Sequence, residues 1–275
     1  MAGRQRHPPP GIDRIVLRHG RQDSMNGSSV HEFSPPSPRF DAAGRRLVPE
    51  VMDQPGLETG LHHQALSALR RINSLSRTAG SLWPAISAVA TQSPPQQPLT
   101  LLDVACGGGD VALRLAQRAQ AQRLSLQVSG CDFSPAAIEY ATRSTVGLSA
   151  AAAPRFFVHD VLAEPLPPAD IVTCTLFLHH LDEAQGVLLL QRLATAARRL
   201  VLVSDLRRTR LGYWMAHLVG RVLTRSPVVR IDGPLSVAAA WSLPEVDRLA
   251  QQAGWQGYQL GGVWPERFLL SWDRS

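Results

Sequence analysis

The sequence predicts an α/β fold, a doubly wound and mostly parallel sheet of seven strands that is preceded by helices. Three observations lead to this fold class. After residue 98, short apolar runs alternate with helical patterns, as expected for strands that are buried on both faces of a sheet. The last two runs are separated by only three residues, so these strands are antiparallel. An acidic residue and three consecutive glycines follow the first run.

The N-terminal part of the chain has the composition of an extension followed by helices. Residues 1–46 combine proline clusters, glycines and arginines with one short apolar patch, which predicts a disordered extension. From Leu61 to Ala90 the apolar residues recur with helical spacing, which predicts a helical preface with an interruption near Pro84. This preface and a polar, proline-rich linker occupy residues 47–98.

The alternating elements and the C-terminal part are expected to form one domain over residues 99–275. Strands are predicted over residues 99–104, 124–131, 155–159, 171–176 and 200–204. Helices are predicted between them over residues 110–122, 135–145 and 182–198.

The alternation ends after the fifth strand. The predicted elements there are an amphipathic helix near residues 207–224, a loop over 226–237, a helix over 244–253, and strands over 258–263 and 267–272. Residues 207–242 would then be a helical insertion or lid. Leu211, Trp214 and Leu218 lie in one apolar stripe of its first helix. Such a stripe most often covers a sheet, and the alternatives are a lid over a substrate and contact with a membrane surface.

Charge and cysteine content exclude several classes of protein. All 28 basic residues are arginine, as is typical of a GC-rich bacterial genome, and residues 1–46 hold eight of them against four acidic residues. The rest of the chain is nearly neutral, whereas nucleic-acid binding normally shows as a concentrated basic face, so the charge argues against a nucleic-acid partner. Cys106, Cys131 and Cys174 lie in strand-like contexts, which predicts neither disulfides nor a metal site.

The sequence also lacks the signals of export and of a membrane span. No apolar run approaches the roughly 18 residues that a spanning helix needs. The first residues have no apolar core of a signal peptide. We therefore expect a cytoplasmic protein, while peripheral contact with a membrane and the oligomeric state stay open.

Polar residues follow four predicted strands at the edge where a doubly wound sheet binds its ligand. They are Asp103 with the glycines of residues 107–109, Asp132, Asp160, and the histidines of residues 179–180. Asp132 lies 23 residues beyond the last glycine, the interval at which an acid accepts hydrogen bonds from ribose hydroxyls. The sequence therefore predicts a site for a nucleotide-like cofactor.

At these positions the chain resembles the class I S-adenosylmethionine-dependent methyltransferases. The resemblance rests on residues 103–109, 130–134, 159–161 and 177–181. Its nearest branch is similar to the small-molecule methyltransferases of quinone and natural-product biosynthesis. The resemblance implies a Rossmann-like fold, S-adenosylmethionine as cofactor, and methylation of a small, hydrophobic or aromatic molecule at oxygen or carbon.

The resemblance also implies cofactor contacts. Asp103 would orient the amino group of the cofactor, and Asp132 would hold its ribose. Phe133 would pack on adenine, and Asp160 would accept from the adenine amino group. The expected cofactor-binding residues are Asp103, Ala105, Cys106, Gly107, Gly109, Asp132, Phe133, Asp160, Val161 and Leu176. The family usually has glycine at the position of Ala105, and alanine is a small substitute.

His179 and His180 are the candidates for a general base, because they follow the fourth strand and histidine titrates near neutral pH. The alternative is that both only pack or hydrogen-bond around the cofactor. The acceptor would be lined by residues of the lid, namely Tyr213, Trp214 and His217. The residues around Cys174 lack the motifs of adenine-amino and cytosine-carbon enzymes, which argues against nucleic acid as the acceptor.

Two other functions compete with methyl transfer. Gly107, Gly109 and Ala112 also fit the dinucleotide fingerprint of an NAD(P)-dependent oxidoreductase. Asp110 would oppose a pyrophosphate at that helix N-terminus, whereas a cationic methyl donor favours nearby carboxylates such as Asp103. A regulator that binds S-adenosylmethionine without catalysis is the other alternative.

Overall fold

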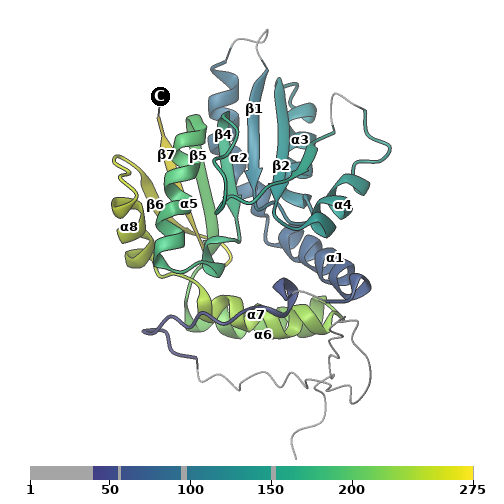
Figure 1. Ribbon diagram of the computed structural model, residues 1–275, viewed down its shortest axis with the longest axis vertical. Helices are drawn as coiled ribbons and strands as arrows, with labels where there is room; N and C mark the ends of the chain where they lie inside the picture. Colours follow the sequence, from purple (N-terminus) through teal and green to yellow (C-terminus); the bar gives the residue numbers. More distant parts are fainter. Residues whose placement is uncertain (1–39, 55–56, 94–97, 150–152, 275) are drawn as a thin grey trace, which may run out of the picture.

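The computed structural model describes residues 40–54, 57–93, 98–149 and 153–274. They form one seven-stranded sheet with the order β3-β2-β1-β4-β5-β7-β6 and a layer of helices at one end (Figure 1). The predicted α/β, Rossmann-like fold is confirmed. Within the described ranges, no helix combines the length and the apolar character needed to cross a membrane.

The strands match the predicted pattern. They are β1 (Leu99–Val104), β2 (Leu126–Asp132), β3 (Arg155–Val158), β4 (Ala169–Thr175), β5 (Ala197–Leu206), β6 (Gln259–Val263) and β7 (Arg267–Asp273). The first five are parallel, and β7 lies antiparallel between β5 and β6. The antiparallel pair at the C-terminal end of the chain is therefore confirmed.

Helices surround the sheet and close one end of it. They are α1 (Thr59–Leu75), α2 (Thr78–Thr91), α3 (Asp110–Ala121), α4 (Pro135–Arg143), α5 (Glu183–Ala196), α6 (Arg210–Leu223), α7 (Pro227–Ala239) and α8 (Leu243–Gln252). Two short 3₁₀ turns, η1 (Val51–Asp53) and η2 (Leu178–His180), complete the described elements.

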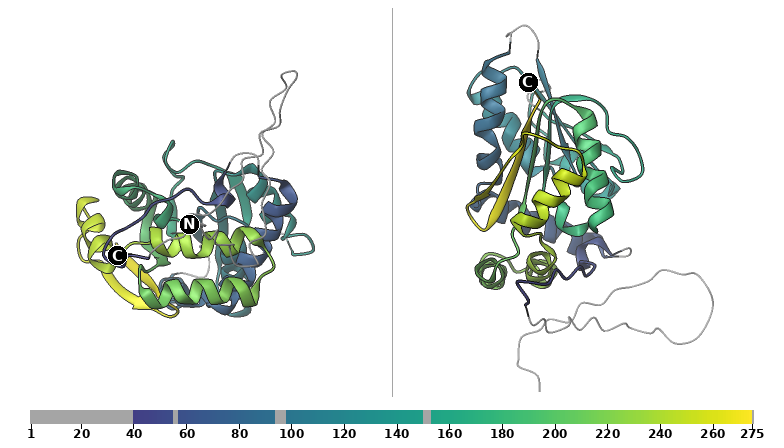
Figure 2. Two further views of the ribbon diagram at one scale, coloured as in Figure 1. Left: turned by 90° about the horizontal axis from the view of Figure 1, so that it is seen from below. Right: turned by 90° about the vertical axis from the view of Figure 1, so that its left-hand side faces the viewer.

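Two apolar cores hold the helices to the sheet. On one face, α2 and α3 pack on β1 and β4 around Leu82, Ile86 and Leu115. On the other face, α5 and α8 pack on β4 and β5 around Leu189 and Phe268. Figure 2 shows the two helical layers on opposite sides of the sheet in its right-hand view. Strands that are buried on both faces explain the continuously apolar runs of the sequence.

The loop predicted over residues 226–237 is wrong, because α7 occupies this segment. The Ser226 hydroxyl accepts a hydrogen bond from the Val229 N–H and caps the helix, and Pro227 occupies its first turn. Pro234 interrupts the helical pattern in the sequence. It is accommodated within the helix, since α7 buries nine of its residues against its neighbours.

The interruption predicted near Pro84 is also misplaced. Pro84 lies inside α2, and the chain breaks instead between α1 and α2, at residues 76–77. Arg77 has a φ of 53°, in the left-handed region, so its backbone cannot continue a helix. The sequence contains no glycine or proline at this break.

The disordered extension was expected to end at residue 46, and residues 1–39 lie outside the described residues. Residues 40–46 are described and do not fit that expectation. Phe40 stacks on Tyr213 with 4.6 Å between the ring centroids. Arg45 lies over the Trp241 ring and donates to the carbonyl oxygens of His179, Leu181 and Ala239. Together with the residues up to 54 they form a segment that we call the strap.

The strap, α1, α6 and α7 lie at the carboxyl ends of the parallel strands (Figure 1). The expected helical insertion after β5 thus consists of α6 and α7. The polar residues at the carboxyl ends of β1, β2, β3 and β4 lie at the edge of the sheet that this helical layer closes, so the sheet edge and the layer together bound the candidate site.

Candidate functional site

The loop between β1 and α3 has backbone angles and close contacts that favour glycine. Ala105, Gly107 and Gly109 all have positive φ angles, between 52° and 74°. A Cβ on Gly109 would lie 2.5 Å from the Phe156 ring, so only glycine fits there. A Cβ on Gly107 would meet no atom within 4 Å, so this side of the loop offers bare backbone to a ligand.

Asp132 connects the ends of the first two strands. Its Oδ2 accepts a hydrogen bond of 2.8 Å from the Gly107 N–H, and its Oδ1 accepts one of 2.9 Å from the Ser134 N–H. Burial raises the pKa of Asp132, and these two hydrogen bonds partly offset that rise. Each carboxylate oxygen keeps a further acceptor position for a ligand hydroxyl.

Asp103 is buried at the end of β1 with one oxygen unpaired. Its Oδ1 accepts a hydrogen bond of 2.8 Å from the Thr173 hydroxyl, while its Oδ2 has no partner among the described residues. Burial raises the pKa of Asp103 to about 7, which the Thr173 hydrogen bond partly counteracts. Asp110 also has a buried, unpaired Oδ2 and a raised pKa, which burial causes. Two such carboxylates beside one loop fit a cationic ligand.

A pocket at this edge brings several predicted residues together. It is lined by Ala105, Asp132, Phe133, His159, Asp160, Val161 and Phe177. Phe133 is exposed, and the Asp160 Oδ1 accepts a hydrogen bond of 2.8 Å from the Leu162 N–H. Sequence reasoning did not select His159 or Phe177 as site residues. The position of Phe177 directly after β4 was an available signal.

Cys106 and Leu176 do not line this pocket. Cys106 is buried under the glycine loop, and burial raises the pKa of its thiol well above the usual range. Leu176 has a φ of 55°, and its N–H donates a hydrogen bond to the Ser204 carbonyl of β5. Leu176 thus turns the chain from β4 toward η2, which carries the two histidines.

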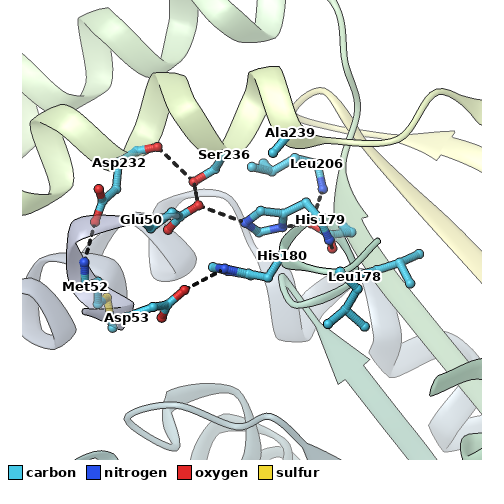
Figure 3. A network of polar contacts seen from close by, with 12 residues as sticks. Glu50, Met52, Asp53, Leu178, His179, His180, Leu206, Asp232, Ser236 and Ala239 are labelled. Atoms are coloured by element: carbon cyan, nitrogen blue, oxygen red, sulfur yellow. Dashed lines mark hydrogen bonds and ion pairs between the residues drawn. The ribbon is translucent and has the colours of Figure 1, made fainter. Parts of the chain in front are cut away.

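His179 is buried between two carboxylates, and Figure 3 shows its contact with one of them, Glu50. Its Nδ1 lies 2.7 Å from the Asp205 Oδ1, and its Nε2 lies 3.4 Å from the Glu50 Oε1. Burial by itself would lower the pKa of His179, but the charges and hydrogen bonds of both carboxylates raise it to about 10. His179 is therefore a cation at neutral pH, with both ring nitrogens engaged.

His180 has a different environment although it is the next residue. It is partly exposed, and its Nδ1 lies 2.9 Å from the Oδ2 of Asp53 in the strap (Figure 3). When the neutral ring donates from Nδ1 to this carboxylate, its Nε2 keeps a free lone pair. Burial is the main cause of the raised pKa of Asp132, and the negative charge of Asp53 raises this pKa further. Asp53 thus lies between the pocket and His180.

Side chains of α7 hold the strap against η2. The Asp232 carboxylate accepts hydrogen bonds of 2.9 and 3.0 Å from the Val51 and Met52 N–H groups. The Ser236 hydroxyl donates to the Glu50 carboxylate, which also faces His179 (Figure 3). These contacts fix the position of Glu50 and of the η1 turn that carries Asp53.

A cavity of about 380 Å³ lies beside the histidines. It is lined by Leu47, Val48, Pro49, Glu50, Asp53, His179, His180 and Ala239. Phe177 lines the pocket, and two residues later the histidines line the cavity. The segment from Phe177 to His180 therefore separates two neighbouring spaces.

The predicted acceptor residues of α6 do not line this cavity. Tyr213 is buried and lies between Phe40 and His217, and the Tyr213 and His217 ring centroids are 4.8 Å apart. Trp214 is exposed to solvent. The strap, which lacks any recognisable pattern in the sequence, occupies the place that the sequence reasoning gave to α6.

Glu50, His179 and His180 also have the donor types of a metal site, with ligand atoms within 4.8 Å of one another. Both ring nitrogens of His179 already face carboxylates, and its raised pKa keeps it protonated. We therefore describe these residues as an ion-pair network.

Sequence reasoning missed three residues of this network, Glu50, Asp53 and Asp205. Asp205 lies near the carboxyl end of β5, so its position at the ligand-binding edge was an available signal. Glu50 and Asp53 carry no such signal, because they reach the site through contacts with α7 and η2 that are distant in sequence.

Comparisons with known proteins agree with this fold and show the family of the chain. Residues 101–199 match the family described as "Methyltransferase domain". The demethylmenaquinone methyltransferase of Deinococcus radiodurans is 31% identical over 184 residues, which are 62% of this chain and 73% of that protein. The chain belongs to the class I S-adenosylmethionine-dependent methyltransferases. It is thus a methyltransferase whose methyl donor is S-adenosylmethionine.

Solved structures show the same fold. Human N-acetylserotonin methyltransferase in complex with S-adenosylmethionine superposes with a TM-score of 0.55 at 17% identity, covering 79% of this chain and 57% of that chain. An O-methyltransferase from neocarzinostatin biosynthesis, in complex with S-adenosyl-L-homocysteine and 1,4-dihydroxy-2-naphthoic acid, gives 0.54 at 20% identity, covering 79% and 60%. This chain thus spans less than two thirds of either protein.

Proposed function

We propose that the protein methylates a small, hydrophobic or aromatic molecule that carries a hydroxyl group, at that oxygen or at a ring carbon activated by it. The observation that carries this proposal is the cavity of about 380 Å³ beside His180, directly next to the pocket at the glycine loop. The relative from Deinococcus radiodurans, a demethylmenaquinone methyltransferase, supports a small acceptor.

In this proposal, the residues at the sheet edge hold the methyl donor. Asp103 accepts from the cationic amino group, which explains why a buried carboxylate keeps one oxygen unpaired. Asp132 accepts from the ribose hydroxyls at the acceptor positions that its two backbone hydrogen bonds leave free. Phe133, Asp160 and Val161 enclose the adenine in the pocket.

The acceptor lies in the cavity under the strap. A volume of about 380 Å³ is within the range of sites for small molecules. Leu47, Val48, Pro49 and Ala239 supply an apolar wall, and Asp53 and His180 supply polar groups. Such a lining favours a compact, apolar molecule with one ionisable hydroxyl.

His180 is the proposed base. S-adenosylmethionine supplies a methyl group on a sulfonium, which is already an activated leaving group, so the main task of the protein is alignment. A hydroxyl nucleophile must also lose its proton, and Asp53 orients the His180 ring and stabilises the cation that forms. His179 is unsuited to this role, since its pKa of about 10 keeps it protonated. It is a positioning residue that ties η2 to Asp205 and Glu50.

The test compares two substitutions at neighbouring positions. The purified protein is assayed with radiolabelled S-adenosylmethionine and a panel of phenols, naphthols and hydroquinones. We expect His180→Gln to lower kcat about 100-fold or more, the usual contribution of a general base, with little change in the affinity for S-adenosylmethionine or in Tm. His179→Gln is expected to lower Tm, because it removes the cation between two buried carboxylates.

Three results would contradict the proposal. Binding of S-adenosylmethionine without transfer to any member of the panel would favour the regulator. An unchanged kcat in His180→Gln would show that His180 is not the general base. Methyl transfer only to amines or thiols would show that the acceptor is not a hydroxyl compound.

A further inference from the structure

The outer face of α6 is apolar and exposed. Leu211, Trp214, Leu218 and Val222 are three or four residues apart, so they share one face of the helix. Their exposed fractions are 56%, 71%, 64% and 70%. The expectation that this stripe covers the sheet, as such stripes most often do, is therefore wrong. These four residues form what we call the α6 stripe.

The opposite face of α6 is fixed to the rest of the protein. Tyr213 stacks on Phe40 of the strap, and Gly220 lies against Arg230 of α7. The Arg230 side chain donates hydrogen bonds to the carbonyl oxygens of Gly220 and Thr224, at the C-terminal end of α6. Figure 2 shows α6 and α7 side by side across this end of the molecule in its left-hand view. The stripe is therefore preformed and directed outward.

The charged residues of α6 itself are all arginines, and Glu266 lies at its N-terminal end, where it accepts a hydrogen bond from the Thr209 hydroxyl. Arg210 precedes Trp214 by four residues, and Arg221 follows Leu218 by three, so both lie next to the stripe on the helix. Neither they nor Arg225 form an ion pair within the described part of the chain, and the sequence has no acidic residue from 206 to 231. Exposed apolar residues flanked by arginine are typical of helices that lie in a membrane interface.

We propose that α6 docks the protein on an anionic membrane surface, with the α6 stripe in the boundary between headgroups and acyl chains. Charge decides between the possible occupants of this face. A second copy would bring the same arginines against one another. Residues 1–39 precede Phe40 and are themselves basic, with six arginines against three acidic residues, so they do not complement the arginines of α6. An anionic lipid surface offers negative charge and an apolar phase together.

Docking through α6 would also bring the acceptor site close to the lipid. The strap packs on α6 through Phe40 and Tyr213, and further along the strap Leu47 and Val48 line the cavity. An apolar acceptor dissolved in the membrane would then be available near the strap. This consequence rests on the proposed function, whereas the docking itself does not.

Vesicle sedimentation tests the docking without any assay of methyl transfer. The full chain is mixed with phosphatidylglycerol vesicles and, separately, with phosphatidylcholine vesicles at low and high salt. We expect binding to phosphatidylglycerol that weakens with salt. The double variant Leu211→Gln, Leu218→Gln is expected to bind at least about tenfold more weakly, because it removes apolar area that the membrane would bury. The double variant Arg210→Gln, Arg221→Gln is expected to lose most of the salt dependence.

The matched control is the double variant Val146→Gln, Leu148→Gln. Both residues are exposed and apolar, and they follow α4, which lies beside the sheet and away from α6 in Figure 1. This control should sediment with the vesicles as the unchanged protein does. Calorimetry with S-adenosylmethionine shows whether each variant keeps its fold, because α6 lies outside the pocket for the donor.

A dye on the stripe distinguishes the other occupants. The three cysteines are buried, so a thiol introduced by Leu218→Cys can be labelled selectively. The emission should shift to the blue only when phosphatidylglycerol vesicles are added. A shift that depends on protein concentration would instead indicate a second copy, and a shift at every concentration without vesicles would indicate residues 1–39. Either shift, or a failure of the unchanged protein to bind the vesicles, would overturn the proposal.

Discussion

The glycine loop and the strap meet at the same edge of the sheet, but they are built over different distances in sequence. The loop is fixed by contacts such as the one between Gly107 and Asp132, which are 25 residues apart. The strap is fixed by contacts of Glu50 with Ser236 and of Val51 with Asp232, which are more than 180 residues apart. The part proposed to hold the methyl donor is thus local in origin, and the part proposed to hold the acceptor is not.

This difference explains how one fold can serve several acceptors. The loop depends on backbone angles and on one buried acid at each strand end, and few residues can replace them. The strap depends on whichever side chains α7 and η2 present to it. Substitutions there change the cavity without disturbing the loop, as expected when specificity is set apart from the scaffold.

The largest effect is expected in the network that holds the strap. Asp205→Asn removes one of the two carboxylates that surround the His179 cation in a buried site. We expect a loss of about 3–5 kcal/mol in the free energy of unfolding, as is usual when one partner of a buried ion pair is removed. Urea unfolding measures it. The exposed pair of Glu139 and Arg143 is the control, since Glu139→Gln should cost about 0.5 kcal/mol or less. Equal costs would show that the network is solvated.

The same network predicts how stability depends on pH. The pKa of His179 is raised from its ordinary value of 6.5 to about 10 in the folded protein. The folded state therefore holds this proton more tightly, so the stabilisation is complete below pH 6.5 and is lost as the pH rises through 10. Urea unfolding of the unchanged protein and of His179→Gln should give curves that converge across this window. Parallel curves would contradict the raised pKa.

The glycine loop predicts a smaller and more specific effect. Gly109→Ala places a Cβ against the Phe156 ring and keeps a left-handed φ of 74°, so we expect a loss of about 3 kcal/mol in stability. Gly107→Ala has a similar φ of 52° but meets open space, so about 1 kcal/mol is expected. Thermal and urea unfolding compare the two variants. A similar cost at both positions would mean that the contact with Phe156 is unimportant.

The smallest effect concerns the donor site. The pKa of Asp103 is about 7 in the free protein, because burial raises it, and the proposed contact with a cationic amino group requires the ionised form. Asp103 is mostly protonated at pH 6 and mostly ionised at pH 8. The affinity for S-adenosylmethionine should therefore rise about tenfold between these two pH values. Calorimetric titration measures this change. Asp103→Asn should bind more weakly and without this pH dependence, and a dependence that persists in the variant would assign it to another group.

The predictable part of the site lies where a few adjacent residues determine the backbone. Asp103, the three glycines and Asp132 could be identified because the end of a strand and the start of a helix have characteristic residues. The antiparallel pair of β6 and β7 followed from a turn too short for any crossover. In these segments local geometry leaves few alternatives: the antiparallel pair is confirmed, and the ligand contacts of Asp103 and Asp132 stay predictions.

The unpredictable part lies where tertiary contacts decide. Pro234 suggested a loop, yet packing against the strap, α6 and η2 holds α7 as a helix. His179 and His180 are identical residues, and only Asp205, Glu50 and Asp53 make one a buried cation and the other a partly exposed group. Residues 40–46 suggested disorder, since the partners of Arg45 lie more than 130 residues away.

The sequence by itself determined the fold class, the strand ends and the methyl donor, because each depends on periodicity and on short motifs whose backbone requirements are local. The tertiary structure alone decided which histidine is buried and which is partly exposed, what encloses the cavity and which face of α6 meets solvent. Those features depend on burial and on charges brought together from distant segments. The neighbours of a residue in space determine how deeply it is buried and which charges it meets. Short sequence patterns do not specify these neighbours.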